Sequence, residues 1–205
     1  MDLVSTKFDL PPTLVPVVVL IGPPGVGKTT IGGALAQRLG CPFLDTDQLI
    51  QASTGLSVPD IFKQYGENTF RKLESSLLAA LVANKSGSGS VMHAKAGAVV
   101  ATGAGLPVQP GNFEELENLG EIICLTAPVS VLAERLSSSG NRPLLNPGAE
   151  GTQADTGAEN AVKRLESLIA ARTQIYARAK WQISAENSNI DEIVERILQI
   201  LSNCD

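Results

Sequence analysis

Short apolar runs alternate with longer amphipathic segments along most of the chain. Apolar runs that indicate buried strands occupy residues 17–21, 41–44, 98–102, 122–125 and 181–184. Apolar positions recur at helical spacing over residues 30–39, 58–83, 113–118, 128–137, 161–178 and 190–201. The second of these helices is expected to break near Gly66. This alternation predicts an α/β fold, a three-layer sandwich whose five-stranded parallel sheet is flanked by helices.

A glycine-rich segment joins the first predicted strand to the first predicted helix. Its residues, Gly22-Pro23-Pro24-Gly25-Val26-Gly27-Lys28-Thr29, match G-x-x-x-x-G-K-[ST], the phosphate-binding loop (P-loop) of P-loop NTPases. Glycines allow successive backbone N–H groups to face phosphate oxygens, with the positive end of the next helix behind them. Lys28 would reach the β- and γ-phosphates and the Thr29 hydroxyl would bind Mg²⁺. A plain Gly/Pro turn is the alternative, but the flanking strand and helix favour an ATP site over residues 22–29 and Thr30.

The composition argues against nucleic-acid binding, a disulfide or zinc framework and a membrane-spanning segment. Aromatic residues make up only 4% of the chain against 43% hydrophobic residues, so the core must be largely aliphatic. The net charge of −5, without a basic stripe, argues against a nucleic-acid partner. Three widely spaced cysteines suit a reducing compartment better than a disulfide framework or a zinc site. The apolar runs are too short to span a bilayer, so we expect a cytoplasmic monomer that needs no membrane.

The length predicts one domain over residues 1–205, large enough for a sizeable core. Residues 1–15 are expected to form a loose N-terminal extension. Residues 137–159 are polar and glycine-rich, with low periodicity, yet they contain Arg142-Pro143-Leu144-Leu145. Long connections of this kind in compact domains are often lids. An arginine on such a lid would neutralise charge as a phosphoryl group moves.

Two further groups of candidate residues follow predicted strands. Asp45 and Asp47 come at the carboxyl end of the second strand, where ligands bind in open α/β sheets. Alone, such a pair more often marks a turn or a helix cap. Beside a P-loop, one carboxylate can hold Mg²⁺, directly or through water, and the other can accept a hydroxyl proton. Gly103-Ala104-Gly105, after the third strand, allows close backbone approach to a ligand, or forms a plain tight turn.

Taken together, these motifs resemble those of the shikimate kinase family, small P-loop kinases related to nucleoside monophosphate kinases. The similar segments are the P-loop, Phe43-Leu44-Asp45-Thr46-Asp47, Gly55 with Asp60-Ile61-Phe62, Gly66-Glu67 with Phe70-Arg71 and Glu74, Ala101-Thr102-Gly103 with Gly105, Arg135-Leu136 with Arg142-Pro143-Leu144-Leu145, and Arg172 with Tyr176. Beyond the P-loop no single segment is specific, whereas their order and spacing together are. The resemblance extends over residues 17–195.

This resemblance implies an enzyme that uses ATP and Mg²⁺ to phosphorylate a shikimate hydroxyl, giving shikimate 3-phosphate in aromatic amino acid biosynthesis. Lys28 and Thr29 would hold the phosphates and the metal, with Asp45 supporting the metal through water. Asp47 would hold the shikimate hydroxyls and act as the base. Arg142, on the lid, would contact ATP and take part in catalysis.

The resemblance also implies a site for the substrate's carboxylate. Arg71 and Arg172 would clamp it, because two guanidinium groups from separate elements match a carboxylate's geometry. Arg71 lies one position off the apolar stripe of its helix, so we expect it at the core edge, facing a cleft or solvent. The backbone of Gly103, Ala104 and Gly105 would contact the substrate.

Ala104 departs from the family, which usually has three glycines at this turn. Its backbone N–H can still reach a substrate if φ is negative, whereas a positive φ would cost of order 1 kcal/mol. Extra length near residues 86–97 and 147–159 is a second departure. These departures leave two alternatives open. One is a sister P-loop kinase for another small polyol or sugar acid, and the other is a shikimate-kinase-like binding protein without turnover.

Overall fold

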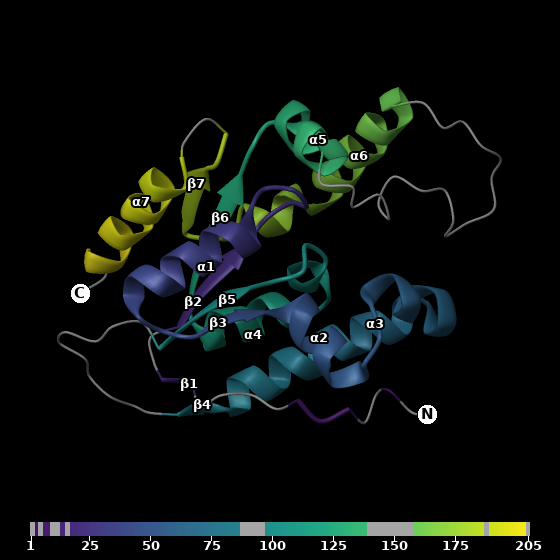
Figure 1. Cartoon of the computed structure of the whole chain (residues 1–205), viewed down its shortest axis with the longest axis horizontal. Helices are drawn as coiled ribbons and strands as arrows, with labels where there is room; N and C mark the ends of the chain where they lie inside the picture. The colour runs from purple at the N-terminus through teal and green to yellow at the C-terminus, as the bar shows by residue number, and fades with distance from the viewer. Residues whose placement is uncertain are drawn as a thin grey trace.

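Five parallel strands form the central sheet (Figure 1). They are β2 (Val17–Ile21), β3 (Phe43–Asp45), β5 (Ala98–Ala101), β6 (Glu121–Thr126) and β7 (Trp181–Ser184). The spatial order is β3-β5-β2-β6-β7, so the first of these strands lies at the centre of the sheet. The computed structural model describes residues 3, 6–8, 13–14, 17–86, 97–138, 158–186 and 189–203.

Helices cover both faces of this sheet. They are α1 (Lys28–Leu39), α2 (Thr46–Thr54), α3 (Val58–Ala83), α4 (Asn112–Leu119), α5 (Val129–Ser138), α6 (Ala158–Tyr176) and α7 (Ile190–Ser202), with a 3₁₀ turn, η2 (Leu106–Val108). Side chains alternate along β2, so Val17 and Val19 enter one core and Val18 and Leu20 the other. The predicted three-layer α/β sandwich is confirmed.

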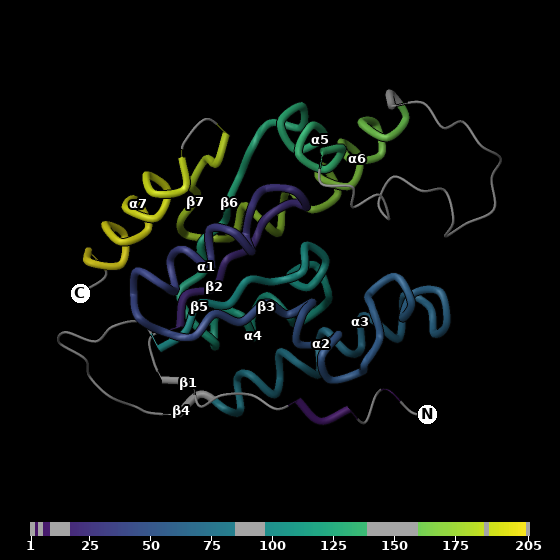
Figure 2. The backbone as a smooth tube through the Cα atoms, viewed as in Figure 1, coloured from purple at the N-terminus to yellow at the C-terminus, as the bar shows by residue number. Residues whose placement is uncertain are grey.

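The two cores involve different helices. The first core lies between the sheet and α2, α3 and α4. The second lies between the sheet and α1, α5 and α7. Helix α6 contributes to both, because Leu165 near its start belongs to the second core and Tyr176 at its end to the first. Figure 2 shows α6 running from α5 towards the middle of the molecule. The end of α6 is thereby brought against η2 and the residues that precede it.

Most predicted elements are confirmed within one to three residues. The largest difference is α2, which the apolar pattern did not indicate because this short helix buries little besides Ile50. The predicted break in the long helix is confirmed, since Gly66 has φ 78° and ψ 168° inside α3.

The expected loose extension over residues 1–15 is wrong in part. A two-residue strand, β1 (Thr13–Leu14), pairs in parallel with β4 (Lys85–Ser86), which follows α3. Leu3 is buried in the first core. No helix in the described part of the chain combines the length and the apolar character needed to cross a membrane.

Candidate active site

The P-loop follows β2 directly and leads into the first turn of α1. Gly27 precedes this helix with φ 100°, and its carbonyl oxygen accepts a hydrogen bond from the N–H of Ile31. Gly22 has φ 140°, and a Cβ on it would overlap the carbonyl oxygen of Leu125 in β6. Helix α1 begins at Lys28, so the N–H groups from Lys28 to Thr30 have no acceptor within the helix. This arrangement leaves N–H groups and a positive helix end available to an anion.

The P-loop lysine is held by the loop itself. Lys28 Nζ donates to the carbonyl oxygens of Gly22 and Pro23, both at 2.9 Å. Burial lowers the pKa of Lys28 to about 8; the charges of Asp47 and Asp45 act to raise this pKa, and that of Arg172 lowers it further. The ammonium group therefore lies within electrostatic reach of both predicted acids.

The two carboxylate oxygens of Asp45 accept hydrogen bonds from three residues. Oδ2 accepts a hydrogen bond from the Thr29 hydroxyl at 2.7 Å. Oδ1 accepts from the backbone N–H groups of Asp47 and Gln48 and so caps α2. The described residues contain no cluster of three or more histidines, cysteines and acids that could hold a metal ion alone. The Thr29 and Asp45 oxygens are nevertheless hard ligands of the kind Mg²⁺ accepts together with phosphates and water.

Two buried carboxylate oxygens lie on the same side of Gly103. Asp47 Oδ1 and Glu74 Oε1 are both buried and have no hydrogen-bond partner within the described part of the chain. A Cβ placed on Gly103 would lie 2.6 Å from the Asp47 oxygen and 2.8 Å from the Glu74 oxygen. Burial raises the pKa of Asp47, as does Asp45, while Lys28 and Arg71 lower it. Both oxygens therefore remain available to accept or share hydrogen bonds from a ligand.

The predicted carboxylate-binding arginine of α3 lies between two acids and two aromatic rings. Arg71 Nη1 contacts Glu74 Oε2 at 2.7 Å, and Arg71 Nη2 contacts Glu67 Oε1 at 2.7 Å. Its Cζ lies 6.0 Å from the ring centroid of Phe62 and 5.6 Å from that of Phe70. The side chain is 19% exposed, in agreement with its predicted place at the core edge.

Glu74 carries the strongest electrostatic perturbation near Arg71. Its side chain is only 1% exposed. Burial raises the pKa of Glu74 to about 7, although the charge and hydrogen bond of Arg71 lower this pKa. The charge of Asp47 raises the pKa further, and the charge of Arg172 lowers it. Arg71 and Arg172 therefore both act on one buried carboxyl group. Arg71 lies in α3 and Arg172 in α6, so the two predicted clamp residues come from separate helices, and their joint binding of a carboxylate stays a prediction.

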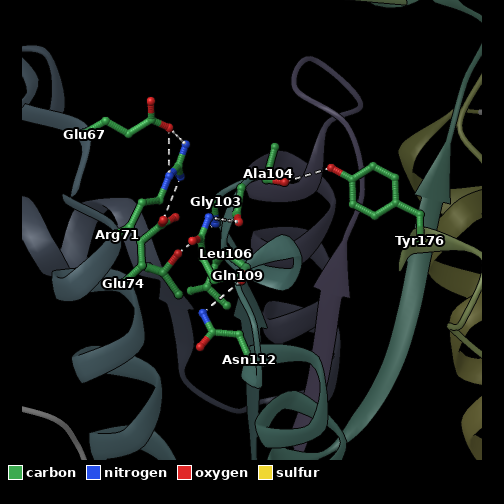
Figure 3. Close-up of polar contacts among 11 residues, drawn as sticks. Glu67, Arg71, Glu74, Gly103, Ala104, Leu106, Gln109, Asn112 and Tyr176 are labelled. Atoms are coloured by element: carbon green, nitrogen blue, oxygen red, sulfur yellow. Dashed lines mark hydrogen bonds and ion pairs between the residues drawn. The ribbon is translucent and has the colours of Figure 1, made fainter. Parts of the chain in front are cut away.

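The turn Gly103-Ala104-Gly105 lies between Arg71 and Tyr176 (Figure 3). On one side, the Gly103 N–H donates to Thr46 Oγ1 at 2.8 Å. On the other, the Tyr176 hydroxyl donates to the Ala104 carbonyl oxygen at 2.8 Å. A Cβ on Gly105 would come within 2.8 Å of Arg71 Cζ and would overlap the guanidinium group. A side chain at the first or third position of the turn would therefore displace Asp47, Glu74 or Arg71, while the middle position holds alanine.

Glu74, Thr46 and Tyr176 stand among the family motifs quoted from the sequence, but none of them was predicted to have a role in the site. Only the i,i+3 spacing of Arg71 and Glu74 gave a local signal for the first. Arg142 and residues 139–157 of the predicted lid lie outside the described residues, as does most of residues 86–97. The P-loop, the pair Asp45 and Asp47, and the turn Gly103-Ala104-Gly105 lie at or just after the carboxyl ends of β2, β3 and β5, whereas Arg71 and Arg172 come from α3 and α6.

A parallel sheet with a P-loop after its central strand, and acids after the next strand, defines a P-loop kinase that acts on a small molecule. The family model for shikimate kinase matches residues 24–202. The chain belongs to the shikimate kinase family. Its expected class, an ATP-dependent phosphotransferase, is confirmed by this membership.

Similar proteins span nearly the whole chain. The shikimate kinase of Thermodesulfovibrio yellowstonii is 32% identical over 89% of this chain and 92% of its own. That of Geobacter sulfurreducens is 36% identical over 88% and 87%. The structure of Acinetobacter baumannii shikimate kinase in complex with shikimate matches with a TM-score of 0.76, at 34% identity over 92% of this chain and 94% of its own. A gluconokinase from Sinorhizobium meliloti, 17% identical with a TM-score of 0.51, shares the fold alone.

Proposed function

We propose that the protein transfers the γ-phosphoryl group of ATP to a hydroxyl of shikimate, giving shikimate 3-phosphate for aromatic amino acid biosynthesis. The observation that carries this proposal is the convergence of two arginines from separate helices, Arg71 and Arg172, with Asp47 and Lys28. Asp47 lies against Gly103 and Arg71 against Gly105 of the same turn, and the charges of Asp47 and Arg172 both act on Lys28. A small ring with one carboxylate and adjacent hydroxyls has the charges that this arrangement complements.

The nucleotide would be bound by the P-loop, Gly22 to Thr29, and by Thr30. Phosphate oxygens would replace the carbonyls of Gly22 and Pro23 as partners of Lys28, and negative charge there would raise the lowered pKa of this lysine. Thr29 would hold Mg²⁺ directly and Asp45 would hold it through water, a role that fits their 2.7 Å contact. When bound, Mg²⁺ neutralises charge on the phosphate oxygens.

The acceptor would lie between the turn and the two arginines. Arg71 and Arg172 would bind its carboxylate, and the backbone of Gly103, Ala104 and Gly105 would approach its ring. Asp47 would orient the attacking hydroxyl and accept its proton through Oδ1, which has no partner among the described residues. The raised pKa of Asp47 brings its basicity closer to neutral pH, which favours proton transfer.

Several further assignments rest on the family resemblance. Residues 137–159 would form the lid, and Arg142 would contact ATP and help to neutralise charge during transfer. Closure of such a lid would keep water from taking the phosphoryl group. We also propose that residues 1–205 act as one domain and as a cytoplasmic monomer, without a nucleic-acid or membrane partner.

A coupled assay of ADP release tests the proposal directly. We expect ADP release to require both shikimate and Mg²⁺. Lys28→Ala should abolish turnover, because phosphate positioning and charge neutralisation are lost. Arg71→Ala should raise the KM for shikimate by roughly 10-fold to 100-fold and leave the KM for ATP nearly unchanged.

Arg38→Ala is the matched control, since Arg38 forms an exposed ion pair with Glu195 and should not affect either constant. Equal losses of ATP and shikimate affinity in Arg71→Ala would contradict the carboxylate clamp. Absence of shikimate-dependent ADP release from a folded, nucleotide-binding protein would overturn the proposed activity.

Ala104 favours testing one second candidate, a sister kinase for another small polyol or sugar acid. A methyl group on the middle residue of the turn changes the surface next to the expected ring. A panel of polyols and sugar acids, assayed at equal concentrations, separates the two candidates by kcat/KM. Nucleotide binding by calorimetry without turnover on the whole panel would instead indicate the non-catalytic binding protein.

A further inference from the structure

We infer that Tyr176 is a positioning residue: its hydroxyl orients the Ala104–Gly105 peptide and thereby sets the affinity of the site for the acid substrate. This inference rests on the function proposed above. It concerns a residue that contacts the turn, and it does not require Tyr176 to touch the substrate.

The turn is held from two sides by buried side chains. Thr46 Oγ1, at the start of α2, accepts a hydrogen bond from the N–H of Gly103 at 2.8 Å. Tyr176, at the end of α6, is 6% exposed and donates its hydroxyl to the Ala104 carbonyl at 2.8 Å. Figure 3 shows the tyrosine reaching the turn from the side opposite Arg71. The turn is therefore hydrogen-bonded to two helices, α2 and α6, that are far apart in the sequence.

The hydrogen bond from Tyr176 determines which way the next N–H points. In a trans peptide the C=O and the following N–H point in opposite directions. Because the Ala104 carbonyl faces α6, the Gly105 N–H faces away from it, towards the side where Arg71 lies. Within the described residues, the N–H groups of Ala104 and Gly105 have no hydrogen-bond acceptor. Two adjacent N–H groups next to a guanidinium can donate hydrogen bonds to an anionic or hydroxyl-bearing ligand.

The same helix links this turn to the second predicted clamp residue. Arg172 precedes Tyr176 by four residues, hence by about one helical turn. Burial raises the pKa of Tyr176, and the charge and hydrogen bond of Arg172 lower it. Helix α6 thus carries both Arg172 and the tyrosine that is hydrogen-bonded to the turn. Ala104 adds a second restraint, because alanine has fewer backbone conformations than glycine.

Tyr176→Phe removes the hydroxyl and keeps the ring. We expect the KM for shikimate to rise roughly 3-fold to 10-fold, the scale of one lost hydrogen bond. The kcat should change by less than about 2-fold and the KM for ATP should stay the same, since neither phosphates nor the base is affected. Tyr65→Phe is the matched control, because Tyr65 is the other tyrosine and is exposed. An unchanged KM for shikimate in Tyr176→Phe would overturn the inference.

A double-mutant cycle with Ala104→Gly separates action on the turn from action on Arg172. If Tyr176 and Ala104 restrain the same turn, the double variant should lose roughly 3-fold more affinity than the product of the single effects. If the affinity loss of the double variant equals the product of the two single losses, Tyr176 acts through Arg172 and not through the turn. That result would contradict the inference.

Amide NMR of the unmodified protein gives a test that requires no variant. Shikimate should shift the Ala104 and Gly105 amide signals, and no shift at either would contradict the inference. A folded wild-type protein without shikimate-dependent ADP release would instead overturn the proposed function. The two failures are therefore distinguishable.

Discussion

Asp45 shows how one side chain can serve structure and site together. Its Oδ1 caps α2 through the N–H groups of Asp47 and Gln48, while its Oδ2 binds the Thr29 hydroxyl. The cap fixes the start of the helix that carries Asp47. A carboxylate at this position therefore orients both the expected base and the expected metal ligand. The helix-cap and metal-site interpretations of this acid pair are compatible.

Glu74→Gln tests the electrostatics of the buried carboxyl beside Arg71. The folded-state pKa of Glu74 is raised to about 7 by burial, so folded protein holds a proton that the unfolded chain releases above the ordinary value of 4.5. The stabilising contribution of this proton is complete below pH 4.5 and is lost as pH rises through 7. The wild-type free energy of unfolding, minus that of Glu74→Gln, should fall by about 1–3 kcal/mol between pH 4.5 and 8. Urea denaturation across this range measures it.

Glu67→Gln is the control for this measurement. Glu67 also contacts Arg71, but its side chain is 62% exposed, so burial cannot disfavour its charge in the same way. The corresponding difference for Glu67→Gln should change by much less over the same pH range. A difference that stays constant for Glu74→Gln, or that rises with pH, would show that Glu74 is ionised throughout.

Residues with a local sequence signal were found, whereas residues defined by long-range packing were not. Lys28 and Thr29 belong to a motif whose spacing is dictated by phosphate binding. Thr46 and Tyr176 contact the turn across 57 and 72 residues of chain, and nothing in their neighbourhoods indicates those contacts. Glu74 lies among the apolar positions of α3, where its burial depends on the whole first core.

At the scale of elements, α3 contains a kink that depends on one glycine. Gly66 has φ 78° and ψ 168°, a combination that only glycine adopts without strain, and a Cβ there would meet no atom within 4 Å. Gly66→Ala should therefore destabilise the protein by roughly 1–3 kcal/mol through backbone strain alone. The first half of α3 carries Phe62, which lies near Arg71, so the KM for shikimate should rise as well.

Gly33→Ala is a control with the opposite expected sign. Gly33 lies inside α1, and a Cβ there would also meet no atom within 4 Å. In a helix interior this change should stabilise the protein by roughly 0.5–1 kcal/mol. Thermal unfolding of the two variants compares them directly. Equal shifts in the two midpoints would show that the α3 kink is not held by the backbone of Gly66.

Helices were predicted correctly where many apolar positions recur at helical spacing. Elements were missed where they are short and depend on contacts with distant parts of the chain. The long α3 and the amphipathic α7 have many apolar positions at helical spacing, and both were predicted. Helix α2 has nine residues and begins at a cap that was considered only as one alternative for its acids. The β1–β4 pair consists of two-residue strands, which no periodicity can indicate.

At the scale of the whole molecule, the elements proposed to bind the nucleotide and those proposed to bind the acid substrate pack mainly on opposite faces of the sheet. The P-loop enters α1 against the second core, whereas Arg71 and Tyr176 belong to helices that pack on the first. Among the described residues, the proposed nucleotide site and the proposed acid site approach each other around Asp45 and Asp47, whose charges both act on Lys28. Helix α6 packs against both cores, with Leu165 in the second and Tyr176 in the first.

This separation predicts selective loss of ligand stabilisation in single-site variants. A ligand at about 100 times its Kd stabilises a folded protein by about 2.7 kcal/mol, which for this chain length raises Tm by roughly 5–10 °C. Shikimate, and separately a non-hydrolysable ATP analogue with Mg²⁺, should each produce such a shift in the wild type. Lys28→Ala should lose the nucleotide shift and keep the shikimate shift, and Arg71→Ala should do the reverse. Loss of both shifts in either variant would mean that the two sites fold or bind as one unit, because each substitution would then disrupt more than its own contacts.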